Sequence, residues 1–216
     1  DCLAKSGFRT IELGHVPLKA NGVLSAALRL ADSWHDLRLL TTVSDVEAMG
    51  EALELGVKDV SVQLAPSDEL SRHYFGISVN GRLRQLEPII ELAGSAQVAV
   101  RGQVLGAFPG VSSEDKFGLT AETAFYAKHL MKMGCFEVVL VDSAGIASVA
   151  MVASVFSALK GLVGFSDLAV RFGDQNGQAL VNTMNALECG AASVDVVSSD
   201  SELAVSSNDL LFSLAS

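Results

Sequence analysis

The sequence predicts an α/β fold, a TIM (β/α)8 barrel of which strands two to eight are visible. Short β-rich runs alternate with longer helical stretches, several runs are almost entirely apolar, and in four places a glycine separates a helix from the next strand. Parallel strands that are covered on both faces read as continuous apolar runs. Alternating strand–helix units of about 30 residues indicate a parallel sheet with helices outside it.

Seven segments have the composition of strands, and Val138-Val139-Leu140-Val141 is the clearest apolar run. The predicted strands are Phe8–Leu13, Leu37–Thr42, Asp59–Leu64, Gln97–Leu105, Glu137–Asp142, Leu168–Phe172 and Ser193–Ser198. Because such barrels close with eight strands, a first strand and most of its helix are expected before Asp1. An open doubly wound sheet is the alternative, but no G-x-G-x-x-G motif follows any predicted strand.

Helices are predicted between these strands, and most of them end at a glycine. Their ranges are 46–55, 81–92, 120–133 and 178–189, followed by Gly56, Gly94, Gly134 and Gly190. Glycine after the last helical turn adopts the left-handed conformation without steric cost. Helix starts are predicted at Thr120 and at Ser44, since Ser44-Asp45-Val46-Glu47 matches the S-x-x-E capping box.

One uncharged stretch needs comparison with a membrane span. Ser143–Leu159 holds seventeen residues without a charge, which is marginal for a span of about 20 residues. Val149, Val152, Phe156 and Leu159 recur at helical spacing. We therefore interpret the stretch as a barrel helix that packs this face on the sheet, and predict no transmembrane segment.

Composition excludes several classes of function. The net charge is −10, and there is neither the basic footprint of a nucleic-acid binder nor a polybasic run for an anionic membrane. Cys2, Cys135 and Cys189 form no C-x-x-C pair, which argues against a disulfide framework and a cysteine zinc site. Only 19% of residues are charged, against about 25% in ordinary domains. Either the core is large or partners cover part of the surface.

Barrel enzymes work at the carboxyl ends of their strands. Here these positions hold Glu12, His15, Arg101 to Gly106, Asp142, and Arg171 to Asp174. Asp142 and Asp174 could form a carboxylate pair for acid–base chemistry, or they could tie strand ends to neighbouring helices. His15 could serve catalysis or simply face solvent. His73 is expected in a polar loop, and no two histidines have the spacing of metal ligands.

Several segments resemble the hydroxymethylglutaryl-CoA lyase family. Gly173 to Thr183 is similar to its seventh-strand signature, Arg101-Gly102-Gln103-Val104 to a segment after its fifth strand, and Met133 to Glu137 to the segment before its sixth. Asp142-Ser143-Ala144-Gly145 resembles the family's Asp-Thr-Ile-Gly. Phe8–Leu13 resembles the family's second strand, which ends in a glutamate, here Glu12. The resemblance runs in order from Leu3 to Asp195.

The resemblance implies an aldolase-type barrel whose active members hold a divalent cation such as Mg²⁺ or Mn²⁺. Their ligands are an aspartate after the first strand, a His-x-His pair after the seventh and an asparagine after the eighth, and the metal acts as a Lewis acid. Here the histidine positions fall on Arg171 and Gly173. Glycine has no ligand atom, and arginine keeps a positive charge that repels a cation. The family's Gly-Gly-Cys-Pro loop has no counterpart after Asp195.

These departures predict a barrel without a metal cofactor, in which Glu12, Arg101, Asp142 and Asp174 are vestigial positions. Arg171 is predicted to replace the charge of the metal and to pair with Asp174 or Glu12.

The expected function is that of a non-catalytic structural subunit, formed by a single domain over residues 1–216 and assembled with other protein subunits. The alternatives are an active lyase that gives acetyl-CoA and acetoacetate, and a metal-free acyl-CoA binding module. From the family's locations we expect the mitochondrial matrix side, with the cytoplasm as the alternative.

Overall fold

The computed structural model describes residues 8–16, 27–29, 37–108 and 116–196. Their strands form one parallel sheet in the order β1-β2-β3-β4-β5-β6-β7, which confirms the predicted barrel-type fold. The strands are β1 (Thr10–His15), β2 (Arg38–Thr42), β3 (Asp59–Leu64), β4 (Ala99–Leu105), β5 (Glu137–Asp142), β6 (Leu168–Phe172) and β7 (Ser193–Val194). All seven predicted strands are present, although β1 lies two residues later than predicted, β4 begins two residues later and β7 is shorter. Val197 and Ser198, the last two residues of the predicted final strand, lie outside the described residues.

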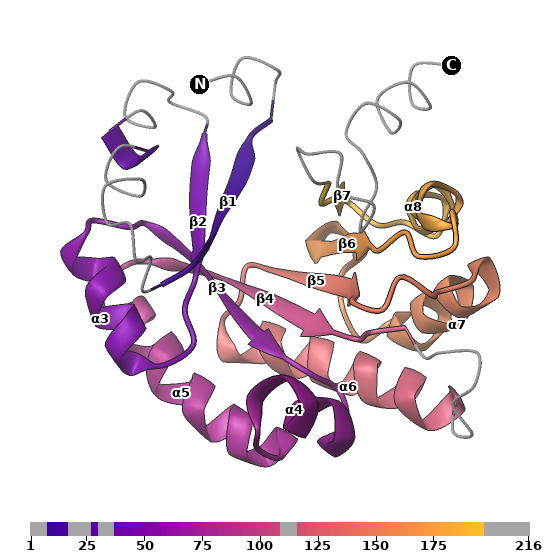
Figure 1. Cartoon of the computed structure of the whole chain (residues 1–216), viewed down its shortest axis with the longest axis horizontal. Coiled ribbons are helices and arrows are strands. Elements are labelled where there is room, and N and C mark those ends of the chain that lie inside the picture. Colours follow the sequence, from indigo (N-terminus) through magenta and orange to yellow (C-terminus); the bar gives the residue numbers. More distant parts are fainter. Residues whose placement is uncertain (1–7, 17–26, 30–36, 109–115, 197–216) are drawn as a thin grey trace.

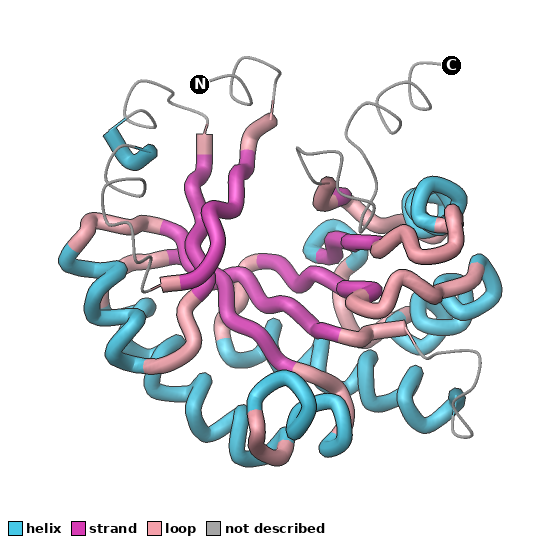
Figure 2. The backbone as a smooth tube through the Cα atoms, viewed as in Figure 1, coloured by secondary structure: helices cyan, strands magenta, loops and turns pink. Residues whose placement is uncertain are grey.

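The sheet is strongly curled, and β1 and β2 stand at a steep angle to β3, β4 and β5 (Figure 1). Helices lie along its outer side (Figure 2). They are α3 (Val46–Glu54), α4 (Asp68–Phe75), α5 (Val79–Ser95), α6 (Lys116–Met133), α7 (Val149–Leu159) and α8 (Ala179–Glu188), with a 3₁₀ turn, η1 (Phe165–Asp167), before β6. In the described part of the chain β1 and β7 each pair with one neighbour and not with each other.

The two faces of the sheet differ in chemistry because side chains alternate along each strand. On the outer face, residues such as Val60, Val62, Val138 and Leu140 are fully buried in the main hydrophobic core, which the helices complete. On the inner face, β5 and β6 contribute a small apolar cluster of Val139, Val141 and Ala169. Polar side chains occupy most of the remaining inner face, so the inside of the curl differs from the apolar filling of an ordinary barrel.

Several helix ends differ from the sequence-based prediction. Asp45, not Ser44, caps α3 by accepting a hydrogen bond from the Ala48 amide at 2.8 Å. Gly56, Gly134 and Gly190 are left-handed, as predicted, but α5 continues through Gly94, and Gln97 adopts the positive φ of 57° instead. α6 begins four residues before Thr120.

Helix α4 was not predicted, and it carries His73, which is therefore helical and not in a loop. Ser67 starts it by accepting a hydrogen bond from the Leu70 amide, and Gly76 ends it in the left-handed conformation. The helix has a low apolar content and is only eight residues long, so its period is difficult to recognise in the sequence.

The uncharged stretch forms α7, which begins at Val149. Val152, Phe156 and Leu159 are buried as predicted, whereas Val149 is exposed and does not belong to the packed face. Among the described residues no helix has the length and apolar character needed to cross a membrane.

Candidate functional site

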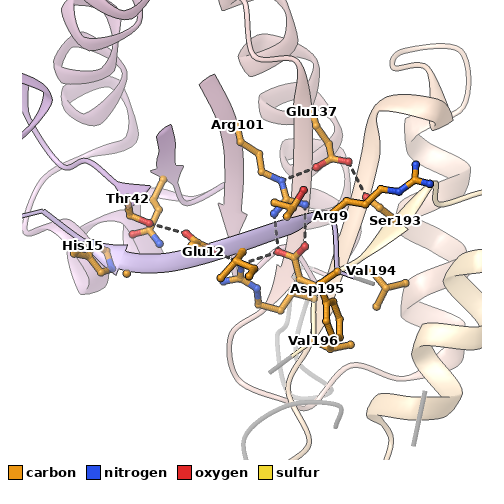
Figure 3. A pocket seen from close by; sticks show the side chains of 16 residues that line it. Arg9, Glu12, His15, Thr42, Arg101, Glu137, Ser193, Val194, Asp195 and Val196 are labelled. Carbon is orange, nitrogen blue, oxygen red and sulfur yellow. Dashed lines mark hydrogen bonds and ion pairs between the residues drawn. The ribbon is translucent and has the colours of Figure 1, made fainter. Parts of the chain in front are cut away.

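A cavity of about 650 Å³ lies inside the curl and is bounded by both edge strands of the sheet. It contains most of the charged residues of the inner face (Figure 3). Its lining includes Arg9, Thr10, Glu12, Gly14 and His15 from β1 and its start, Thr42, Gln63, Arg101, Glu137 and Arg171 from the middle strands, and Ser193 to Val196 from β7 and its end.

Glu12 is the most densely bonded residue of this site. Its Oε1 accepts hydrogen bonds from Thr42 Oγ1 at 2.7 Å, from Gln103 Nε2 at 2.8 Å and from Ser61 Oγ at 3.1 Å. Its Oε2 lies 2.6 Å from Arg171 Nη2. Gln103 is itself held by Gln63, whose Nε2 donates to Gln103 Oε1 at 3.1 Å. Both oxygens of Glu12 are therefore used, and its rotamer is fixed by four strands.

Arg171 joins the two edges of the sheet. Its Nη2 contacts Glu12 on β1 and also Asp195 Oδ2, at 2.7 Å, just after β7. The predicted ion pair with Glu12 is confirmed, whereas the alternative partner Asp174 binds elsewhere. Asp195 was not predicted as a site residue, and it is the residue through which Arg171 reaches the second edge.

Arg101 completes a chain of alternating charges. Its Nη1 and Nη2 contact the two carboxylate oxygens of Asp195 at 2.9 and 2.8 Å, and its Nε contacts Glu137 at 2.5 Å. Ser193 Oγ donates to the other oxygen of Glu137 at 2.7 Å. Arg101 is the third residue of β4, not a residue of its carboxyl end, so the network lies deeper in the sheet than the sequence predicted.

Electrostatics agree with this pairing. Burial alone would raise the pKa of Glu12, but the charge of Arg171 and the hydrogen bonds from Thr42 and Gln103 lower it below its usual value. Burial would lower the pKa of Arg171 and of Arg101, yet Asp195, with Glu12 or Glu137, raises both. The three carboxylates and two guanidinium groups of the network leave one net negative charge.

Asp142 and Asp174 do not line the cavity and do not pair with each other. Asp142 accepts hydrogen bonds from the amides of Ile146 and Ala147, and burial raises its pKa although these bonds oppose the shift. Asp174 accepts a hydrogen bond from the Ala179 amide at 3.0 Å, at the start of α8. Both carboxylates organise loops that follow β5 and β6.

Gly173 lies where these two loops meet. A Cβ atom at this position would come within 2.7 Å of Gly145 Cα and 2.9 Å of the Asp142 carbonyl oxygen. Real Cβ atoms do not approach backbone atoms so closely, so a histidine here would require the loop after β5 to move. The position lacks a ligand atom and also the space for one.

The described residues do not fit a divalent cation. No group of three or more His, Cys, Asp or Glu side chains in this part of the chain is arranged to hold a metal ion. The two carboxylates that converge, Glu12 and Asp195, do so on the guanidinium of Arg171. Mg²⁺ or Mn²⁺, which take oxygen ligands, would have to displace that guanidinium to reach these carboxylates, and a divalent ion beside it would be repelled.

His15 is the last residue of β1 and is exposed at the margin of the cavity. It lies far along β1 from Arg101 and Glu137 (Figure 3). Glu137, Ser193 and Asp195 were not predicted as site residues. The alternation of side chains along a strand could have found them, because alternate residues of each strand point into the cavity.

The sequence has relatives among known proteins. The HMGL-like family model matches residues 1–198. The mitochondrial hydroxymethylglutaryl-CoA lyase of Rattus norvegicus is 32% identical over 151 residues, which cover 70% of this chain and 46% of that protein. A 3-hydroxy-3-isohexenylglutaryl-CoA/hydroxy-methylglutaryl-CoA lyase of Pseudomonas aeruginosa is 35% identical over 147 residues, 67% of this chain and 47% of that one. The chain thus spans less than half the length of these relatives.

The structural comparison agrees with the sequence comparison. The crystal structure of hydroxymethylglutaryl-CoA lyase from Pseudomonas aeruginosa superposes with a TM-score of 0.90 at 27% identity, covering 100% of this chain and 75% of that chain. Since the family model covers most of the sequence and the curled sheet matches a solved lyase, this chain belongs to the HMGL-like family.

Proposed function

We propose that this chain is a hydroxymethylglutaryl-CoA lyase-like barrel that has lost metal-dependent C–C cleavage and serves as a non-catalytic structural subunit of a larger protein complex. The observation that carries this proposal is the position of Arg171. Its guanidinium occupies the point on which Glu12 and Asp195 converge. A site with that arrangement has no carboxylate free to hold a catalytic cation.

The surface supports the assembly part of the proposal. Phe125 on α6, Val149 on α7 and Val181 on α8 are exposed, and α7 packs against both other helices. Five charged side chains are used inside the curl, in a chain of which only 19% is charged. Contiguous apolar patches mark surfaces that partner proteins cover, and we propose that these three side chains belong to such a patch. The mitochondrial relatives make the matrix side of mitochondria our proposed location.

The test combines activity with size. The purified chain is incubated with hydroxymethylglutaryl-CoA and either Mg²⁺ or Mn²⁺, and acetoacetate is measured beside an active lyase as a positive control. We expect no acetoacetate above the enzyme-free rate. The chain is then tagged in its native source, and the mass of the particle that contains it is measured. We expect a particle with other, stoichiometric subunits.

The two outcomes are independent. Metal-dependent acetoacetate formation would show an active lyase and overturn the loss of catalysis. A stable, soluble monomer in the native source would overturn the subunit assignment.

The cavity favours one further candidate, a metal-free acyl-CoA binding module. A cavity of about 650 Å³ is enough for part of such a ligand. Thermal-shift measurements with CoA esters distinguish the two, since a ligand that binds only the folded state raises the melting temperature.

A further inference from the structure

We infer that Arg171 is the resident cation of this site, a side-chain ion that closes a two-carboxylate cation site and ties the edge strand β1 to the segment after β7. The inference deepens the proposed function and rests on it in one respect, namely that the wild-type chain does not use a divalent cation. It adds that the guanidinium of Arg171 takes the place of a metal ion, and that this group joins the two edges of the sheet.

The geometry is that of a coordinated ion. One nitrogen atom, Arg171 Nη2, contacts Glu12 Oε2 at 2.6 Å and Asp195 Oδ2 at 2.7 Å, so two carboxylates from opposite edges of the sheet point at a single centre. Both contacts have the length of charge-assisted hydrogen bonds. Asp195 is fixed from its other side by Arg101, and Glu12 by Thr42, Ser61 and Gln103.

This preorganisation means that the carboxylates cannot easily turn away if the guanidinium is removed. Their like charges would then face each other across a partly buried space, while Arg101, the other arginine of the network, is already shared between Asp195 and Glu137. Two converging carboxylates with polar neighbours are the kind of oxygen-rich site that Mn²⁺ or Mg²⁺ accepts. Removal of Arg171 should therefore both loosen the edges and create affinity for a divalent cation.

The experiment uses Arg171→Ala, with Arg171→Lys as the variant that keeps a cation. Mn²⁺ binding is measured by electron paramagnetic resonance, and melting temperature is measured with and without Mn²⁺. We expect Arg171→Ala to melt at a lower temperature than the wild type, to regain part of the loss with Mn²⁺, and to bind Mn²⁺ at least about tenfold more tightly, a change of about 1.4 kcal/mol. Arg171→Lys should bind no more Mn²⁺ than the wild type.

Two controls locate the effect. Arg72→Ala removes an exposed arginine whose ion pair with Asp68 lies on one helix, and it should change neither property. Adding Asp195→Asn to Arg171→Ala should abolish the gained Mn²⁺ binding. Hydrogen exchange of β1 and of residues 193–196 should rise in Arg171→Ala and remain unchanged in Arg72→Ala.

The inference is overturned if Arg171→Ala gains no Mn²⁺ binding, or if the gain survives Asp195→Asn. An Arg171→Ala chain that is unfolded and is not restored by Mn²⁺ also counts against it, because the resident cation would then not be exchangeable. Failure of the proposed function has a different signature, since the wild-type chain would itself bind Mn²⁺ or produce acetoacetate.

Discussion

At the scale of single residues, Glu12 shows how a side chain can keep its place while its chemical role changes. The sequence identified Glu12 and Arg171 because they stand at positions that the family signature marks. The period of two places Asp195 on the inner face of the last strand, but the register that brings residue 195 beside Val170 depends on sheet pairing and could not be predicted from the sequence. Sheet pairing also decides how far Arg101 lies from the carboxyl end of its strand. The sequence therefore did not predict that Arg101 lies in the middle of the sheet.

Replacing Glu12 with glutamine should destabilise the protein in a pH-dependent way. The carboxylate bonds to Arg171 and to three neutral donors, so its loss should cost about 1.5–3 kcal/mol at pH 7. The folded-state pKa of Glu12 lies below 4.5. Its contribution is therefore fully present above pH 4.5 and is lost as the pH falls through the folded pKa. Urea unfolding of both chains at about pH 7 and about pH 3 measures the difference, and an equal difference at both pH values would contradict the role of charge.

At the scale of elements, the strands were easier to predict than the helix ends. Apolar runs on the outer face fix the positions of β3, β5 and β6 almost to the residue, because each of them must be buried by helices. Helix ends depend on single hydrogen bonds, such as the one from the Ala48 amide to Asp45, and on which residue adopts a positive φ, as Gln97 does in place of Gly94. Such choices are settled by tertiary packing.

Gly173→Ala should destabilise the contact between the loops that follow β5 and β6. The added Cβ would meet the backbone of Gly145 and Asp142, so one loop must move, at an expected cost of about 1–3 kcal/mol. Chemical denaturation gives this number. Gly50→Ala in α3 is the matched control, since a Cβ atom at that position would have no neighbour within 4 Å and alanine favours helix. A neutral Gly173→Ala variant would show that the two loops do not touch as described.

Arg82 on α5 holds together the ends of β2 and β3. It is 4% exposed and donates to the carbonyl oxygens of Ser44 and Gln63 at 2.8 and 2.9 Å. Burial lowers its pKa to about 10, although Asp45 opposes the shift. Arg82→Met leaves both carbonyl groups without this partner and should cost about 2–3 kcal/mol in unfolding free energy. Arg72→Met, in which an exposed arginine is lost, should cost less than about 0.5 kcal/mol, and similar values for both would refute the assignment.

At the scale of the whole molecule, an ion-pair network lies inside the curled sheet. The inside of the curl holds a network of five charged side chains, while Phe125, Val149 and Val181 are exposed on the outer helices among charged residues. Ion pairs, and not backbone hydrogen bonds between strands, join the two edges of the described sheet. We therefore expect its edge strands to be less protected from hydrogen exchange than its central strands. The sequence predicted a parallel barrel-type sheet. It did not predict the polar interior, because the direction of the curl decides which of the alternating side chains face inward.

Native-state hydrogen exchange should therefore show a gradient across the sheet. β3, β4 and β5 have a strand on either side and contribute to the main core, so their amides should exchange most slowly. The amides of β1 and β7 should exchange faster, because each of these strands has one paired neighbour in the described residues and opens without disturbing the centre. Exchange followed by mass spectrometry resolves these segments, first on the isolated chain and then on the native particle.

In the particle, protection should increase over α6, α7 and α8, where Phe125, Val149 and Val181 are exposed in the isolated chain. Equal protection of these helices in both samples would show that the partner subunits dock elsewhere, and equal protection of β1 and β4 in the isolated chain would show that the edge strands are already covered.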